Sequence, residues 1–215
     1  VAMSVPFELM EAAILSSVGE TPAPLADQNF APLLPGLVGQ EFALIDLGVL
    51  SPHFEAGNWE QPGIDRRLLD EAATVHGLAA SRYGQYRLSR TRPDSAVEPE
   101  TFPLHVELHL PHGTVLEAPF GGTLRKGADG LLSLHDGPLS LRLWGVKTAL
   151  NPGAVLVEGQ IIGEVHAPLM VQVCRADIEP PLFCAPSRVP AWQALCPSPA
   201  TLLGLACDAV GRAHV

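Results

Sequence analysis

Residues 131–145 have the sequence LLSLHDGPLSLRLWG, in which two runs of alternating apolar and polar residues flank the turn residues Asp136 and Gly137. Alternation with a period of two is typical of half-buried strands, and Asp-Gly between two such runs indicates a hairpin. The pattern continues on both sides, with LHVELHL and TVLEAPF before this hairpin and AVLV, QIIGEV and LMVQVCR after it. Roughly six or seven short strands predict an antiparallel β sandwich or barrel over residues 104–175.

The flanking residues predict a few peripheral helices around this mainly β fold. Helical periodicity and capping residues occur in three stretches, 1–20, 65–80 and 198–210. In the second of these, Asp65 is the expected cap and Val75 is expected to face inward. EFALIDLG at 41–48 predicts one further strand. We therefore divide the chain into an N-terminal helical and linker segment with one strand (1–100), a β domain (101–178) and a C-terminal loop with a short helix leading to a next domain (179–215).

Composition excludes several classes of partner. The 215 residues include 13 Lys and Arg against 23 Asp and Glu, a net charge of −10. Such a field repels nucleic acid and anionic membrane surfaces. No stretch is typical of a secretory signal or a transmembrane helix. The four cysteines, Cys174, Cys184, Cys196 and Cys207, show no CxxC spacing, which favours reduced thiols in a cytoplasmic protein.

Two segments carry a resemblance to known families. NPGAVLVEGQIIGEV at 151–165 and APFGGTL at 118–124 resemble both the LytM-type M23 zinc metallopeptidase domain and the related biotinyl/lipoyl carrier domain. The longer stretches 104–124 and 141–165 look like the two successive segments of the M23 domain. A carrier domain needs a lysine at a hairpin tip, whereas the tip here is EVHAPLM at 164–170. The resemblance therefore implies a degenerate LytM/M23-like β sandwich.

The flanks extend the resemblance to a multidomain setting. SRYGQYRLSRT at 81–91 and ALCPSPATLLGL at 194–205 are similar to segments that border this β domain in large fusion proteins. Those proteins join an aminoglycoside-phosphotransferase-like kinase domain to a class III PLP-dependent aminotransferase or phospholyase domain. The resemblance implies a cytoplasmic multienzyme acting on small amino compounds, with ATP/Mg²⁺ and PLP bound in neighbouring domains and no cofactor in this fragment.

The M23 metal ligands can be compared with this sequence one at a time. In the family, zinc is held by the His and Asp of H-x-x-x-D and by the second His of a later H-x-H. The first ligand position keeps His105, the Asp position is His109, and Glu107 replaces the glycine between them. On a straight strand the two histidines lie about 13 Å apart, at about 3.3 Å per residue. Bonds of about 2.0–2.1 Å to one zinc ion cannot span that separation.

The remaining catalytic positions are also altered. The family's H-x-H position holds Pro168 and Met170 in place of histidines, and its Y-G-H histidine is Val146. Only His166 is close enough in sequence to supply a displaced third imidazole. We predict no catalytic residue, with His105 and His109 as a remnant metal site and Val146, Pro168 and Met170 at the positions of lost catalytic residues.

Three functional hypotheses follow. The first is a non-catalytic module whose partners are the flanking domains of the same polypeptide, with a homo-oligomer left open. The second is a divergent zinc metallopeptidase or amidase, in which zinc is the cofactor. The third is a peptide- or glycan-binding domain that kept the groove without cleavage. Three further histidines, His112, His135 and His166, are expected in turns, the first two facing solvent.

Overall fold

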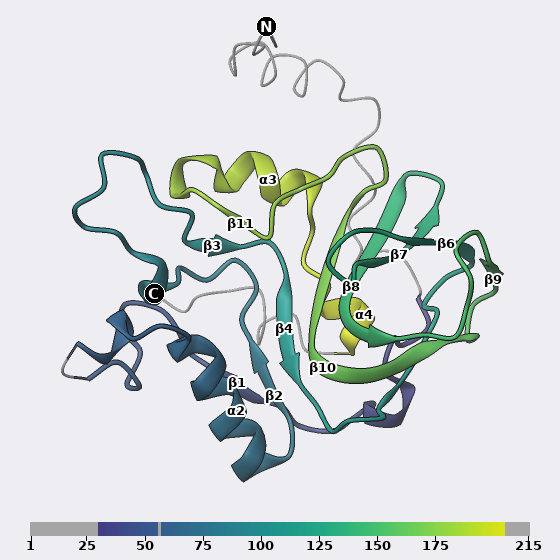
Figure 1. Ribbon diagram of the computed structural model, residues 1–215, viewed down its shortest axis with the longest axis horizontal. Helices are drawn as coiled ribbons and strands as arrows, with labels where there is room; N and C mark the ends of the chain where they lie inside the picture. Colours follow the sequence, from purple (N-terminus) through teal and green to yellow (C-terminus); the bar gives the residue numbers. More distant parts are fainter. Residues whose placement is uncertain (1–29, 56, 205–215) are drawn as a thin grey trace, which may run out of the picture.

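The computed structural model describes residues 30–55 and 57–204, and a nine-stranded sheet forms its centre (Figure 1). The strand order is β1-β2-β4-β10-β8-β7-β6-β9, with β5 paired to β10 off this path, and a separate two-stranded sheet pairs β11 with β3. The predicted mainly β fold with few helices is confirmed. The sheet is mixed, because β1 pairs with β2 in parallel. The strands are β1 (Ala43–Ile45), β2 (Ala79–Ser81), β3 (Phe102–Pro103), β4 (Val106–His109), β5 (Val115–Glu117), β6 (Gly122–Lys126), β7 (Leu132–Asp136), β8 (Leu139–Lys147), β9 (Val155–Leu156), β10 (Ile161–Arg175) and β11 (Phe183–Cys184).

Strand β10 runs through the middle of the sheet and pairs with β4, β5 and β8 (Figure 1). The sequence predicted a turn at Ala167-Pro168, but the structure has one strand of 15 residues there. The register against β8 shifts between Val165 and Met170. Proline has no N–H to donate to a ladder, and an irregular register tolerates it. The proline therefore marks a bulge within one strand.

The two faces of the sheet differ in chemistry. Alternate residues such as Leu108, Leu141 and Leu169 are fully buried in the main apolar core. The residues between them point to the opposite side, here called the outer face. Glu107, Met170 and Trp144 lie side by side there, because Met170 is paired with Glu107 on β4 and with Trp144 on β8. Because successive residues of a strand point to opposite sides of the sheet, the residues of the candidate site share the outer face.

Helix α2 (Ile64–His76) packs against β1 and β2 (Figure 1) and is shorter than predicted. It begins after Gly63 rather than at an Asp65 cap, and Val75 is 76% exposed instead of inward-facing. Gly77, with a φ of 83°, ends the helix, since glycine adopts this left-handed region without strain. The Ala-rich residues that follow form strand β2, which is fully buried.

The C-terminal residues contain more structure than predicted. A helix α3 (Val189–Leu195) occurs where a loop was expected, and α4 (Ala200–Leu203) is capped by Gly204; residues 205–210 of the helix predicted there lie outside the described residues. The predicted helix at 1–20 and residue Cys207 lie outside the described residues; the other three cysteines are free and buried. Within the described ranges, each helix is too short or too polar to cross a bilayer. The single-turn helices are η2 (Pro35–Leu37), η3 (Asn58–Glu60), η4 (Leu88–Arg90) and η5 (Pro186–Arg188).

The three predicted segments share this architecture. Strands β1 and β2, from residues 1–100, extend the same sheet as the β domain through the pairing of β2 with β4. Strand β11, from residues 179–215, pairs with β3 next to the start of β4. The β domain is therefore completed by residues outside 101–178, by β2 along one edge of β4 and by β11 along β3.

Candidate functional site

Strand β4 carries both candidate ligands on the outer face, but at opposite ends. His105 directly precedes the strand and His109 is its last residue. His105 is 1% exposed and His109 is 4% exposed. The two rings have separate sets of partners, so each is considered in turn.

His105 is covered by the C-terminal segment. Its Nδ1 donates a hydrogen bond of 3.0 Å to the carbonyl oxygen of Leu182. The ring of Phe183 meets it edge to face, with 5.1 Å between ring centroids. Burial, with a smaller contribution from the charge of Arg87, lowers the pKa of His105 to about 4. His105 is therefore a neutral, buried imidazole at physiological pH.

His109 lies between two carboxylates from different elements. Its Nδ1 is 2.7 Å from Asp70 Oδ1 on α2, and its Nε2 is 3.0 Å from Glu107 Oε1 on the same strand. An ionised carboxylate only accepts hydrogen bonds, so both ring nitrogens donate and the ring is an imidazolium. Burial opposes this charge, but the hydrogen bonds and charges of Glu107 and Asp70 outweigh it and raise the pKa of His109.

Glu107 joins the two histidine environments. Burial favours its neutral form, but the hydrogen bond and charge of His109, with smaller contributions from His105 and Arg87, lower its pKa overall. The sequence indicated Glu107 only as the residue that replaced a glycine. In the structure it is the internal counter-ion of His109.

The three residues that the M23 resemblance aligns with catalytic positions lie around the bulge between β8 and β10. Val146 packs against the main core, Pro168 lies in the register shift, and Met170 stands opposite Glu107. Gly145 has a φ of 84°, and a Cβ there would lie 2.3 Å from the carbonyl oxygen of Pro168. The bulge therefore requires glycine at position 145.

His166 was expected in a turn but belongs to β10. It is exposed, and its Nδ1 donates to the carbonyl oxygen of Gly145 at 3.0 Å. His135 was also expected in a solvent-facing turn, yet it lies on β7, half-buried, with its Nε2 2.9 Å from Ser133 Oγ. The described residues contain no group of three or more His, Cys, Asp or Glu side chains placed to hold a metal ion.

Residues 180–184, here called the cover segment, close the outer face on the His105 side. Besides Leu182 and Phe183, the carbonyl oxygens of Pro180 and Pro181 accept hydrogen bonds of 2.9 Å from Arg142 and Gln172 on the sheet. A backbone bond from Leu104 N to Leu182 O, of 2.8 Å, fixes the segment in register. The cover segment therefore fills the part of the outer face next to His105.

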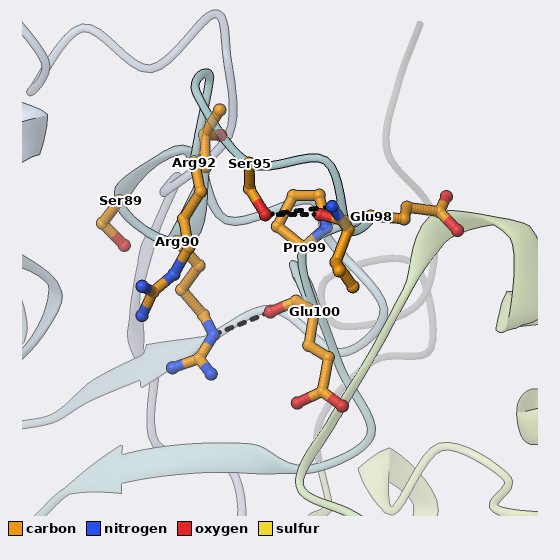
Figure 2. A pocket seen from close by; sticks show the side chains of 9 residues that line it. Ser89, Arg90, Arg92, Ser95, Glu98, Pro99 and Glu100 are labelled. Atoms are coloured by element: carbon orange, nitrogen blue, oxygen red, sulfur yellow. Dashed lines mark hydrogen bonds between the residues drawn. The ribbon is translucent and has the colours of Figure 1, made fainter.

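A cavity is formed by one loop of the chain, and Figure 2 shows the side chains that line it. It has a volume of about 500 Å³ and is lined by residues 89–92, 95 and 97–100. Arg90 Nε donates to the carbonyl oxygen of Glu100 at 2.8 Å, as Figure 2 shows, and its guanidinium lies 3.7 Å from the centroid of the Phe183 ring. Arg90 thus contacts the Phe183 ring in a cation–π interaction.

A second cavity, of about 590 Å³, lies at the other end of β4 between α2 and the loop after the strand. Its lining includes Asp70, Thr74, His109, His112 and Pro168. His112 is exposed in a turn, as predicted. Here the imidazolium of His109 is the only buried charge, and it is already paired with both carboxylates.

Sequence reasoning missed the partners that decide the state of both histidines. Glu107 could have been found, because residues two apart on a strand share a face. Asp70 lies 39 residues before His109 on an exposed helix face, and Leu182 lies 77 residues after His105. Nothing in the local pattern around either residue indicates such a contact.

Comparisons with known proteins find similarity only at the level of the fold. No model of a known protein family matches the chain, and a search of curated proteins finds no match. Among solved structures, the chain is similar to Csd3 of Helicobacter pylori (22% identity, TM-score 0.31), covering 34% of this chain and 23% of that one. Pseudoalterin, an M23 metalloprotease from the deep sea, is 8% identical with a TM-score of 0.31, covering 35% and 57% of the two chains.

The catalytic domain of lysostaphin, an antimicrobial peptidase of Staphylococcus simulans, is also similar. The identity is 19% and the TM-score 0.37, and the match covers 54% of this chain and 94% of that domain. The first two matches span less than two thirds of the proteins they match.

Proposed function

We propose that this chain is a non-catalytic M23 peptidase-like module that positions neighbouring domains of a larger polypeptide. The supporting observation is that both ring nitrogens of His109 are already engaged, at 2.7 and 3.0 Å, by carboxylates of the same chain. A metal ligand must offer a ring nitrogen with a free lone pair. An imidazolium held between two anions offers none.

The neighbouring residues support the same proposal. The Nε2 of His105 belongs to a ring that is buried between Phe183 and the sheet, while the Nδ1 is used by Leu182. The proton-handling histidines of the family are replaced by Val146 and Pro168. With the cover segment over the His105 side, a peptide substrate or a glycan has to displace part of the chain itself to reach this face.

The larger setting is the second part of the proposal. We place the module between a kinase domain that uses ATP/Mg²⁺ and a PLP-dependent aminotransferase domain of a cytoplasmic multienzyme. The resemblance of residues 81–91 and 194–205 to the bordering segments of such proteins supports this. Charged residues make up only 17% of this 215-residue chain. Such a composition is suited to contacts between domains.

Zinc content tests the non-catalytic proposal. We expect the protein purified without chelators to hold less than one equivalent of zinc and to show no amidase activity on peptide substrates. His109→Gln and the exposed control His112→Gln should leave both results unchanged. One equivalent of zinc that is lost in His109→Gln but kept in His112→Gln, with folding intact by circular dichroism, would overturn the proposal in favour of a divergent zinc hydrolase.

A replacement experiment tests the proposed setting. In the longer polypeptide, exchanging the whole folded unit, residues 30–204, for a flexible Gly/Ser linker should leave the kinase and aminotransferase activities measurable when each is assayed alone. Complete loss of either activity would assign the module a direct part in that reaction.

A further inference from the structure

A third cavity lies on the outer face, away from both histidines of β4. It has a volume of about 220 Å³ and is formed between strands β6, β7 and β8 and residues 176–179. Its polar lining consists of three cationic side chains, a histidine and two serines: Arg125, Lys126, Arg142, His135, Ser133 and Ser140. One carboxylate, Glu179, lines it as well. A net positive lining stands out in a chain whose net charge is −10.

The register of the sheet places these groups next to one another. Ser133 on β7 is paired with Arg125 on β6 and with Arg142 on β8, so that a hydroxyl lies between two guanidinium groups in one row. The adjacent row of the same face pairs His135 with Ser140. Both serines are buried, with exposed fractions of 7% and 2%. The two serines are therefore the buried part of the lining, whereas Arg125 and Lys126 are exposed.

Arg142 is fixed in place by neutral groups. Its Nη1 donates to Gln172 Oε1 at 2.8 Å and to the carbonyl oxygen of Pro180 at 2.9 Å. Its guanidinium also lies 5.1 Å from the centroid of the Trp144 ring. These contacts orient the side chain without cancelling its charge. Among the described residues, no ion pair within 4.0 Å involves Arg142, Arg125 or Lys126.

The nearby positive charges affect the pKa of His135, which lines the same cavity. Burial lowers the pKa of His135, and the charges of Arg125 and Arg142 lower it further. At neutral pH the ring of His135 is therefore uncharged, and its Nε2 either donates a hydrogen bond to Ser133 Oγ or accepts one from it. The positive charge of the cavity comes from the two arginines and the lysine.

We infer that this cavity binds a small phosphate dianion, either inorganic phosphate or the phosphoryl group of a small organic phosphate. Guanidinium groups match the geometry of phosphate oxygens, and an orientated arginine loses little freedom on binding. The serine hydroxyls supply further donors to the same oxygens. The volume is below the roughly 300–1,000 Å³ of typical small-molecule sites, which favours a compact anion. This site is independent of the non-catalytic proposal.

The two lysines of the chain provide an internal control for the test. Lys126 lines the cavity, whereas Lys147 lies outside it, and both are exposed. In the intact 215-residue chain, we expect inorganic phosphate to slow acetylation of Lys126 by an amine-reactive reagent and to leave the rate at Lys147 unchanged. The rates are read by mass spectrometry of the two peptides. Equal rates at Lys126 with and without phosphate would overturn the inference.

A pair of arginine variants measures the binding itself. Arg125→Gln removes one cation from the cavity, and Arg92→Gln removes an exposed loop cation elsewhere. Titration of phosphate, followed by NMR shifts of the β6–β8 amides, should give a dissociation constant about tenfold weaker in Arg125→Gln, since a hydrogen bond to a charged group is worth about that factor. Arg92→Gln should match the wild type. Equal affinities in all three proteins would contradict the proposed site.

Comparison of two probes identifies the source of the phosphoryl group. Methyl phosphate binding as tightly as inorganic phosphate indicates a site for an esterified phosphate, whereas tighter binding of inorganic phosphate indicates the free ion. Failure of both to bind at millimolar concentration would overturn the inference. None of these results depends on zinc content, so they are distinguishable from the test of the proposed function.

Discussion

The pairing of His109 with Glu107 predicts how stability depends on one substitution and on pH. Glu107→Gln keeps the size of the side chain and removes its charge. The side chain of Glu107 is 21% exposed and that of His109 is 3% exposed, so little water screens the pair. A hydrogen bond to a charged group of this kind contributes about 1.5–3 kcal/mol, and we expect the variant to lose that much free energy of unfolding at pH 6.

Asp70→Asn is the matched comparison, because Asp70 contacts the other nitrogen of the same ring. Its side chain is 57% exposed. Water screens an exposed ion pair, and such pairs contribute below about 1 kcal/mol. The Asp70 contact is the shorter of the two, at 2.7 against 3.0 Å, so burial rather than distance should set the order of the two losses.

The sign of the pH dependence follows from the raised pKa of His109. Its ordinary value is 6.5 and its folded value lies above that. Stability from the protonated ring is therefore fully present below pH 6.5 and is lost as the pH rises through the folded pKa. Glu107, whose pKa is lowered, stays ionised throughout this range, and His105, with a pKa of about 4, stays neutral.

Urea unfolding at pH 6 and pH 9 measures both effects. We expect the difference between wild type and Glu107→Gln to shrink from about 1.5–3 kcal/mol at pH 6 to below about 1 kcal/mol at pH 9, where a neutral ring makes an ordinary hydrogen bond. A difference that stays the same at the two pH values, or an equal loss in Asp70→Asn and Glu107→Gln, would refute the assignment of an imidazolium.

Two further predictions concern the bulge and the covered histidine. Gly145→Ala should lower the free energy of unfolding by about 2 kcal/mol or more, because position 145 has a φ of 84° and a Cβ would lie 2.3 Å from Pro168 O. The control Gly153→Ala has a similar φ of 86° but open space around it, and it should lower the free energy of unfolding by only about 1 kcal/mol. Equal losses in the two variants would exclude the clash at position 145. For His105, the ring proton resonances should titrate near pH 4; a midpoint near 6.5 would mean that the cover segment leaves the ring open to water.

The strands were predictable where local patterns suffice. Asp136-Gly137 located the β7–β8 hairpin, because the turn and both alternating runs lie within about fifteen residues. Residues 79 and 80 were assigned to a helix, since alanine favours helices and only burial between β1 and β4 makes this segment a strand. Pro168 suggested a turn, yet the bulge opposite Gly145 accommodates it. Each error concerns a residue whose structure depends on distant partners.

The candidate site was predictable only in part. Sequence patterns placed His105 and His109 on one strand face, and the structure has them on one face as well, with Glu107 between them. What the patterns could not supply is the chemical state of each ring. That state depends on Asp70, Leu182 and Phe183, which are brought near β4 by α2 and by the pairing of β11 with β3.

The cover segment has a consequence for how far this folding unit extends. A polypeptide ending at residue 178 would leave Arg142 and Gln172 without the carbonyl oxygens of Pro180 and Pro181, and His105 without Leu182. Each lost hydrogen bond removes about 0.5–1.5 kcal/mol, and more where the donor is charged, which together is a large part of the margin of a typical domain. Any shortened version meant for crystallisation or binding work should therefore retain the chain through Cys184.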